Sequence, residues 1–251
     1  MKKLALLLSF LLSTVTSAQE RNPGDYTRLL IPVTLRDVHG ANGSLWTTEW
    51  TVFNGSSATL DLVGPFVAQD HTVPAGATRK LALEQGFGGA DGAFVYVPNA
   101  QFAAMAHTLR ARDVSVDAQS FGTEIATPLR DDFRTLVRLV DIPTDARYRA
   151  TLRIYSTFET PLTVRMNIYA PDRAEPLESR QVALSGIVHV IEEPFPSHPA
   201  YAQVDLLTPS LRAAAPSLRV EVSSADTGVP VWAFVSITND TTQQVTTVTP
   251  R

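Results

Sequence analysis

The chain has 251 residues, a formal net charge of -4 at pH 7 and no cysteine. A mildly acidic chain lacks the basic surface that nucleic acids and anionic membranes bind, so neither is an expected partner. The absence of cysteine excludes disulfides, cysteine nucleophiles, cysteine-ligated zinc and a lipidated N-terminal cysteine. Folding must therefore rely on the burial of apolar side chains, in one large or two ordinary domains.

Residues 1–18 have the pattern of a secretory signal peptide. Lys2 and Lys3 form a positive segment, Leu4 to Leu12 an apolar one, and Thr16 to Ala18 supply small residues for cleavage. The apolar stretch is shorter than the roughly 20 residues of a membrane-spanning helix, although a retained N-terminal anchor is the alternative. We therefore expect an exported chain, extracellular or periplasmic, without membrane insertion after cleavage. Cleavage removes two lysines and no acid, so the formal charge moves from -4 to -6.

Glycine-containing turns divide the first half of the chain. Asn42-Gly43 lies between LRDVHG and SLWTTEW and predicts a hairpin, because Asn-Gly tolerates positive φ at both central positions. Asn54-Gly55 follows a strand that ends at Phe53 and predicts a second tight turn. The stretch from Gly86 to Gly92 predicts a flexible loop before the strand AFVYV.

Apolar and polar residues alternate in YRATLRIYS (148–156), PLTVRMNIY (161–169) and SLRVEVSS (217–224). A period of two is typical of half-buried strands in antiparallel sheets. No window of helix length keeps the helical period of about 3.6, and only two short helical turns are predicted, at Asn99 to Met105 and Ser210 to Ala215.

The outward rows of two of these strands are polar and rich in arginine. They consist of Arg149, Thr151 and Arg153 on one strand and Thr163, Arg165 and Asn167 on the other. Such a face is either solvated or a surface for an acidic partner.

The last segment, VWAFVSITNDTTQQVTTVTP, predicts the final hairpin of a folded core. Trp232 and Phe234 lie on one face of the first strand and Val231, Ala233 and Val235 on the other, as in a strand buried on both sides. Asn239-Asp240 begins the turn, and the polar stretch returns as the partner strand.

Two weak internal repeats suggest a duplicated unit. The segment 106–113 resembles 233–240, and each is followed by a Thr-rich stretch that ends in Thr-Pro. RLLIPV at Arg28 likewise echoes RLVDIPT at Arg138.

We therefore predict an all-β protein with two tandem antiparallel β-sandwich (Ig-like) domains after the signal peptide. Their expected bounds are 26–130 and 133–251, divided near Asp131-Asp132. One continuous sandwich is the alternative.

No assembled catalytic or metal site is visible in the sequence. HExxH, G-x-S-x-G and Walker motifs are absent, and none of the five histidines pairs with another at metal-ligand spacing. The adjacent carboxylates Asp131-Asp132 and Glu192-Glu193 point to opposite faces of a strand, so neither pair forms an acid–base site by itself. We therefore predict no catalytic residue, no metal and no cofactor.

Two aromatic residues are the remaining candidates for a binding site. Trp46 and Trp50 share one strand face, where an exposed pair would stack on sugar rings or dock a peptide. Packing of both indoles in the core is the alternative. A further hypothesis is a hydrolase site assembled from distant residues, with Asp70, His71 and His107 as its members.

Three segments carry a resemblance to known proteins: SFGTEI (120–125), DIPTDARYRATLRIY (141–155) and the final hairpin at 231–250. They resemble a group of uncharacterised bacterial secreted proteins with tandem β-sandwich repeats behind a signal peptide. The resemblance implies structural rather than catalytic motifs.

The leading functional hypothesis is a secreted non-enzymatic protein that acts through its surface. Its role would be interaction, adhesion or an envelope-associated structural role, with an unknown protein or glycan partner. A carbohydrate-binding module and a hydrolase are the alternatives.

Overall fold

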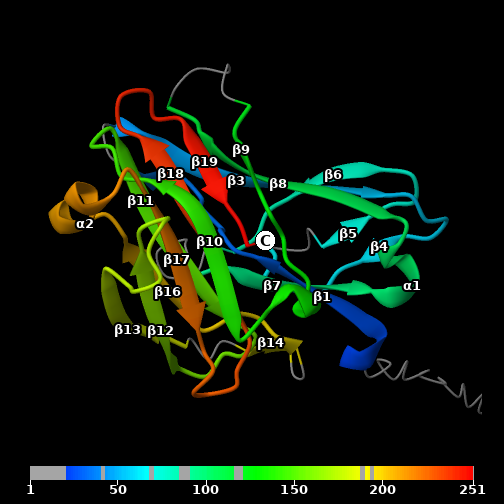
Figure 1. Ribbon diagram of the computed structural model, residues 1–251. Helices are drawn as coiled ribbons and strands as arrows, with labels where there is room; N and C mark the ends of the chain where they lie inside the picture. The colour runs from blue at the N-terminus through cyan, green and yellow to red at the C-terminus, as the bar shows by residue number, and fades with distance from the viewer. Residues whose placement is uncertain are drawn as a thin grey trace, which may run out of the picture.

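The computed structural model describes residues 21–40, 43–67, 71–84, 91–115, 121–186, 190–192 and 195–250. Strands dominate these residues, which confirms the predicted all-β class (Figure 1). The α-helices described are the short α1 (Asn99–Phe102) and α2 (Pro209–Ala214), at the two predicted positions. The expected signal peptide lies outside the described residues. Among those described, no helix is long and apolar enough to span a membrane.

The N-terminal half is organised around the long strand β3, which pairs with β2 and β6 along one edge and with β8 along the other. β8 continues to β9, while β1 pairs with β7 and β4 with β5, all antiparallel. A 3-10 turn, η1 (Pro23–Asp25), precedes the strands. The strands are β1 (Tyr26–Ile31), β2 (Val38–His39), β3 (Leu45–Asn54), β4 (Leu60–Asp61), β5 (Thr72–Val73), β6 (Thr78–Leu81), β7 (Ala93–Pro98), β8 (Met105–Asp113) and β9 (Thr123–Ile125).

The C-terminal half contains two antiparallel four-stranded sheets, with strand orders β10-β17-β12-β13 and β16-β11-β18-β19. A small hairpin, β14–β15, lies beside them. The strands are β10 (Leu136–Pro143), β11 (Tyr148–Ser156), β12 (Leu162–Tyr169), β13 (Glu178–Leu184), β14 (Val190–Glu192), β15 (Phe195–Pro196), β16 (Tyr201–Asp205), β17 (Ser217–Ser223), β18 (Val231–Asn239) and β19 (Val245–Val248).

The inward rows of these two sheets form one continuous core, which we call the C-terminal cluster. It is built largely from the alternating apolar residues that the sequence pattern selects, among them Leu152, Ile154, Met166, Val220 and Val222. Each of these side chains is fully buried. The structure therefore confirms that the period of two in β11, β12 and β17 reflects one buried face.

A second cluster, the N-terminal cluster, fills the other half. It contains Leu29, Trp50, Phe94 and Leu109, but also five aromatic residues of the C-terminal half. Three of these five, Tyr155, Trp232 and Phe234, we call the junction rings. The two faces of β18 therefore serve different cores, with Val231, Ala233 and Val235 in the C-terminal cluster. Pairing of β18 with β19 confirms the predicted final hairpin.

The junction rings pack closely against one another and against the N-terminal half. Tyr155 and Phe234 are stacked at 6.5 Å between ring centroids, and Trp232 lies 5.4 Å from Phe234. The Tyr155 hydroxyl donates a hydrogen bond to the carbonyl of Pro32, and the Phe94 N–H donates to the carbonyl of Ser197 at 2.8 Å. Burial of each large aromatic side chain contributes about 1.5–3 kcal/mol, so this contact is a strong attachment between the halves.

Local turns follow from the glycine and asparagine positions. Gly43 has φ +77° in the β2–β3 hairpin, as predicted, while its neighbour Asn42 lies outside the described residues. At the second turn Asn54 is buried, and its side-chain oxygen accepts the N–H of Ser56 at 3.0 Å. The predicted loop at 86–92 lies outside the described residues, apart from its last two positions.

The expected boundary between domains lies in a short 3-10 turn, η3 (Arg130–Asp132), which connects the two halves. Asp131 and Asp132 are exposed, and the Asp132 carboxylate accepts the N–H of Leu129 at 2.8 Å. These carboxylates therefore shape a solvated turn. Of the other adjacent pair, Glu192 ends β14 and Glu193 lies outside the described residues.

Candidate ligand-binding cleft

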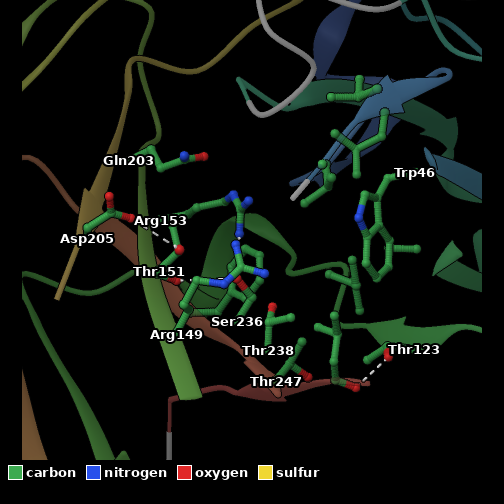
Figure 2. Close-up of a pocket in the computed structure, with 18 of the residues that line it drawn as sticks. Trp46, Thr123, Arg149, Thr151, Arg153, Gln203, Asp205, Ser236, Thr238 and Thr247 are labelled. Atoms are coloured by element: carbon green, nitrogen blue, oxygen red, sulfur yellow. Dashed lines mark hydrogen bonds between the residues drawn. The ribbon is translucent and has the colours of Figure 1, made fainter. Parts of the chain in front are cut away.

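A cleft of about 350 Å³ lies between the two halves of the molecule (Figure 2). One wall is the outward face of the sheet β16-β11-β18-β19, and the other consists of residues from β2, β3, β8, β9 and the chain after β1. Its volume falls within the roughly 300–1,000 Å³ that is typical of small-molecule sites.

Strand alternation explains the polar wall. Leu152 and Ile154 of β11 enter the C-terminal cluster, so Arg149, Thr151 and Arg153 face the cleft. The arginine-rich row that the sequence offered as solvated or as a partner surface is therefore one side of the cleft. Neighbouring strands add more polar side chains, namely Gln203, Asp205, Ser236, Thr238 and Thr247.

Arg153 is the most constrained charged group in the cleft. Its Nη1 donates a hydrogen bond to Ser236 Oγ at 2.8 Å, and its Cζ lies 5.7 Å from the centre of the Phe234 ring. Burial lowers the pKa of Arg153, but an arginine remains protonated at neutral pH. Its Nε is shielded from solvent and has no hydrogen-bond partner among the described residues.

The charge of Asp205 partly compensates that of Arg153, since it opposes the lowering of the Arg153 pKa by burial, but the two side chains form no ion pair among the described residues. Arg149 forms an ion pair with Asp240, while the carboxylate of Asp205 accepts a hydrogen bond from Thr151 Oγ1 at 3.4 Å. Among the described residues, Arg153 itself has no carboxylate within salt-bridge distance. The lining therefore contains two arginines and one aspartate, and only Arg149 of the two arginines forms an ion pair among the described residues.

Trp46 borders the cleft on the opposite side from the arginines (Figure 2). The indole is half-buried, and its Nε1 donates a hydrogen bond to Ser44 Oγ at 2.9 Å. A Cβ on Gly40 would lie 2.8 Å from this Nε1, so the close approach of the hairpin to the indole requires glycine. The ring is thereby held with apolar neighbours Val33 and Leu35 in the same wall.

Trp50 has a different environment from Trp46. Although both lie on β3, Trp50 is only 1% exposed, stacks on Phe66 at 6.3 Å and donates its Nε1 hydrogen to His107 Nδ1 at 3.3 Å. An exposed pair of indoles is therefore not formed, and Trp46 alone borders the cleft. Trp50 packs in the N-terminal cluster, which is the core alternative that the sequence left open.

The residues suggested for a hydrolase have different surroundings where the structure describes them. Asp70 lies outside that part. His71 Nε2 is 3.5 Å from Asp61 Oδ1, whereas His107 contacts Trp50, and burial lowers the pKa of His107. No group of three or more possible metal ligands occurs among the described residues.

A serine–histidine contact that sequence reasoning missed occurs at the junction between the halves. Ser197 Oγ and His198 Nδ1 are 2.9 Å apart, and Glu159 Oε1 accepts the N–H of Ser197 at 3.0 Å. Ser197 is only 1% exposed and His198 7%. A nucleophile needs access to its substrate, so this arrangement is structural.

A second hollow, of about 430 Å³, adjoins the cleft and shares Trp46 and Thr123 with it. Thr123 Oγ1 donates a hydrogen bond to the carbonyl of Val245 at 2.6 Å, which ties β9 to β19 beside both hollows. The turn residues 242–244 and the strongly exposed Phe121 extend this surface away from the arginines.

Comparison with known proteins adds no assignment: no protein-family model, no curated protein and no solved structure matches the chain.

Proposed function

We propose that this chain is an exported, non-enzymatic binding protein that holds its ligand in the cleft between two tandem β-sandwich units. One observation carries the proposal: a charged, largely desolvated Arg153 without a carboxylate partner faces a cleft whose other wall presents Trp46. Arginine and tryptophan are the residue types that most often supply binding energy at recognition sites.

The chemistry of the cleft supports binding rather than hydrolysis. Its lining contains hydroxyls, an amide, two arginines and the single carboxylate Asp205. Glycoside hydrolysis typically uses two carboxylates, and acyl transfer needs an accessible nucleophile beside a base. The cleft as described brings neither set together.

Export and tandem construction complete the proposal. The N-terminal 18 residues have signal-peptide composition, which supports an extracellular or periplasmic location. The equivalent order of strands β3, β8, β9 and β11, β18, β19 supports two related units. An adhesion or envelope-associated role is compatible with such a binding cleft.

The test is a binding screen on the mature chain with three probe classes: neutral oligosaccharides, acidic oligosaccharides and acidic peptides. We expect saturable binding of at least one class, weakened by Arg153→Gln and by Trp46→Ala. Arg165→Gln is the matched control, because Arg165 is exposed on β12 in the other sheet and pairs with Asp226 at 3.2 Å. A probe affinity that is unchanged by both cleft substitutions would contradict the proposal.

A further inference from the structure

We infer that the ligand of this cleft is a carboxylated pyranose, the uronic acid type of sugar, either free or as a unit of an acidic glycan. The inference rests on the proposed binding function and specifies its ligand class. Three features of the cleft carry it: an anion site, a flat apolar surface and a row of hydroxyls between them.

Arg153 supplies the anion site. Nη1 donates to Ser236 Oγ, whereas Nε has no hydrogen-bond partner in the part of the chain that the structure describes, so the Nε–Nη2 edge of the guanidinium is the one that a ligand can address. A carboxylate binds such an edge through two parallel charge-assisted hydrogen bonds. Because Nε is shielded from solvent in this conformation, binding requires a small rotation of the guanidinium toward the cleft.

Because Arg153 is largely desolvated, a bound carboxylate stabilises it more than it would stabilise an exposed arginine. A buried charge without a partner is costly, and an ionic partner with good geometry offsets that cost. Arg149 already has Asp240 as a partner, so Arg153 is the group that an added carboxylate compensates. A single carboxylate fits this site better than a phosphate dianion, because Asp205 contributes a negative charge to the same wall.

Trp46 supplies the flat apolar surface. The indole N–H is engaged by Ser44, which fixes the ring and leaves its face for stacking. One face of a pyranose ring is lined by C–H groups, and these pack on an aromatic face as other apolar groups do. The apolar surface thus lies across the cleft from the arginine (Figure 2).

The polar wall supplies partners for sugar hydroxyls. Thr151, Ser236 and Thr238 carry hydroxyls that both donate and accept hydrogen bonds, and Gln203 offers an amide. Asp205 accepts only, which suits a sugar O–H. An acidic peptide has the charge but no polyhydroxyl ring, so it leaves these groups and the Trp46 face unmatched.

The experiment compares oligomers of glucuronate and galacturonate with the neutral glucose and galactose oligomers of the same length. Binding to the mature chain is measured by calorimetry and by tryptophan fluorescence. We expect the uronates to bind about tenfold or more tightly than their neutral counterparts, the typical effect of a charge-assisted hydrogen bond. Raised salt should narrow this difference.

Variants locate the effect within the cleft. Arg153→Gln should reduce uronate affinity to near that of the neutral sugars, and the fold-loss should be larger for the uronates than for the neutral sugars. Arg153→Lys should recover part of the loss, because lysine keeps the charge but lacks the planar fork. Trp46→Ala should weaken both sugar series, and Arg165→Gln neither. Thermal melting of each variant separates loss of binding from loss of folding.

The other outcomes distinguish failure of the sugar assignment from failure of the proposed binding function. Equal binding of neutral and acidic sugars, unaffected by Arg153→Gln, overturns the carboxylate inference but leaves a binding cleft. Preferential binding of poly-glutamate that depends on Arg153 also overturns the sugar assignment and leaves the proposed function. No binding of any probe at millimolar concentration overturns both.

Discussion

Strands of the N-terminal half pair in the order β6-β3-β8-β9, and those of the C-terminal half in the order β16-β11-β18-β19. Outside these sheets, β1 pairs with β7 in the N-terminal half, and β10 pairs with β17 in the C-terminal half. The segments that repeat in the sequence lie in equivalent strands, β8 with β18 and β1 with β10. The proposal of two related units rests on these correspondences.

The interiors of the two halves differ. β12 and β13 have eight and seven residues, whereas β4 and β5 have two each. The C-terminal cluster is filled by its own two sheets, while the N-terminal cluster includes Tyr155, Trp232 and Phe234 from the other half. The comparison teaches that the half with the shorter strands completes its core with side chains from its neighbour.

Removal of residues 231–250 should have the largest effect. It deletes β18, which is the central partner of β11, and it removes Trp232 and Phe234 from the N-terminal cluster. We therefore expect both halves to unfold, with loss of the circular dichroism minimum of β-sheet and rapid proteolysis. Retention of a folded N-terminal half would contradict the dependence described above.

Phe234→Ala and Val235→Ala each perturb one of the two clusters, because these neighbouring side chains of β18 point into different clusters. Truncation of a buried phenylalanine costs about 3–5 kcal/mol of unfolding free energy. Amide hydrogen exchange should accelerate first in β1 and β7 for Phe234→Ala, and in β12 and β17 for Val235→Ala. Identical exchange patterns in the two variants would show that the clusters unfold as one unit.

Alkaline pH should loosen the contact between the halves. Burial raises the pKa of Tyr96 to about 12, and its hydroxyl donates a hydrogen bond to the carbonyl of Pro196 at 2.7 Å. The unfolded chain loses the tyrosine proton near pH 10 while the folded chain keeps it. This contribution to stability is thus fully present below pH 10 and is lost as pH rises to about 12.

The expected loss from Tyr96 is roughly 2–3 kcal/mol, measured from the denaturation midpoints at pH 9 and near pH 12. Tyr96→Phe should remove this part of the pH dependence. Burial also raises the pKa of Tyr155, so some alkaline destabilisation should persist in that variant. An unchanged alkaline profile in Tyr96→Phe would exclude Tyr96 as a source.

Gly40→Ala should have the smallest effect on stability. Its main effect should be to displace Trp46 in the wall of the cleft. The added methyl group would overlap Ser44 Oγ and lie 2.8 Å from Trp46 Nε1, so the Ser44 side chain, the indole or the hairpin must shift. We expect a cost of about 1 kcal/mol, at the low end of overpacking penalties, because the hairpin is at the surface. A shift of tryptophan emission and weaker ligand binding would report displacement of Trp46. Ser44→Ala, which removes the hydrogen-bond acceptor without added volume, is the comparison variant.

The fold was predictable from the sequence where one face of a strand is buried. Leu152 and Ile154 alternate with Thr151 and Arg153, and this pattern specifies the strand and its inward face before any pairing is known. Likewise, the apolar residues on both faces of β18 specify double burial. The two-residue strands β4 and β5 leave no such pattern, because they are shorter than one full alternation.

The cleft was predictable only in part. Trp46 and the arginine row are visible as residue types, but their position across from each other depends on how the sheets are joined. That joining is fixed by long-range contacts such as Tyr155 with Pro32, for which local sequence carries no signal. Sequence alone also treats Trp46 and Trp50 alike, since only the strand neighbours decide which indole Phe66 covers.

The position of Arg153 above the ring of Phe234 has a thermodynamic consequence. A single strand, β18, carries both the wall that touches a bound molecule and the ring that joins the halves. A ligand that binds only the assembled cleft raises the unfolding free energy of the whole protein in proportion to the logarithm of its concentration. Saturation should therefore protect amides of β1 and β7, which do not line the cleft, as well as those of β11.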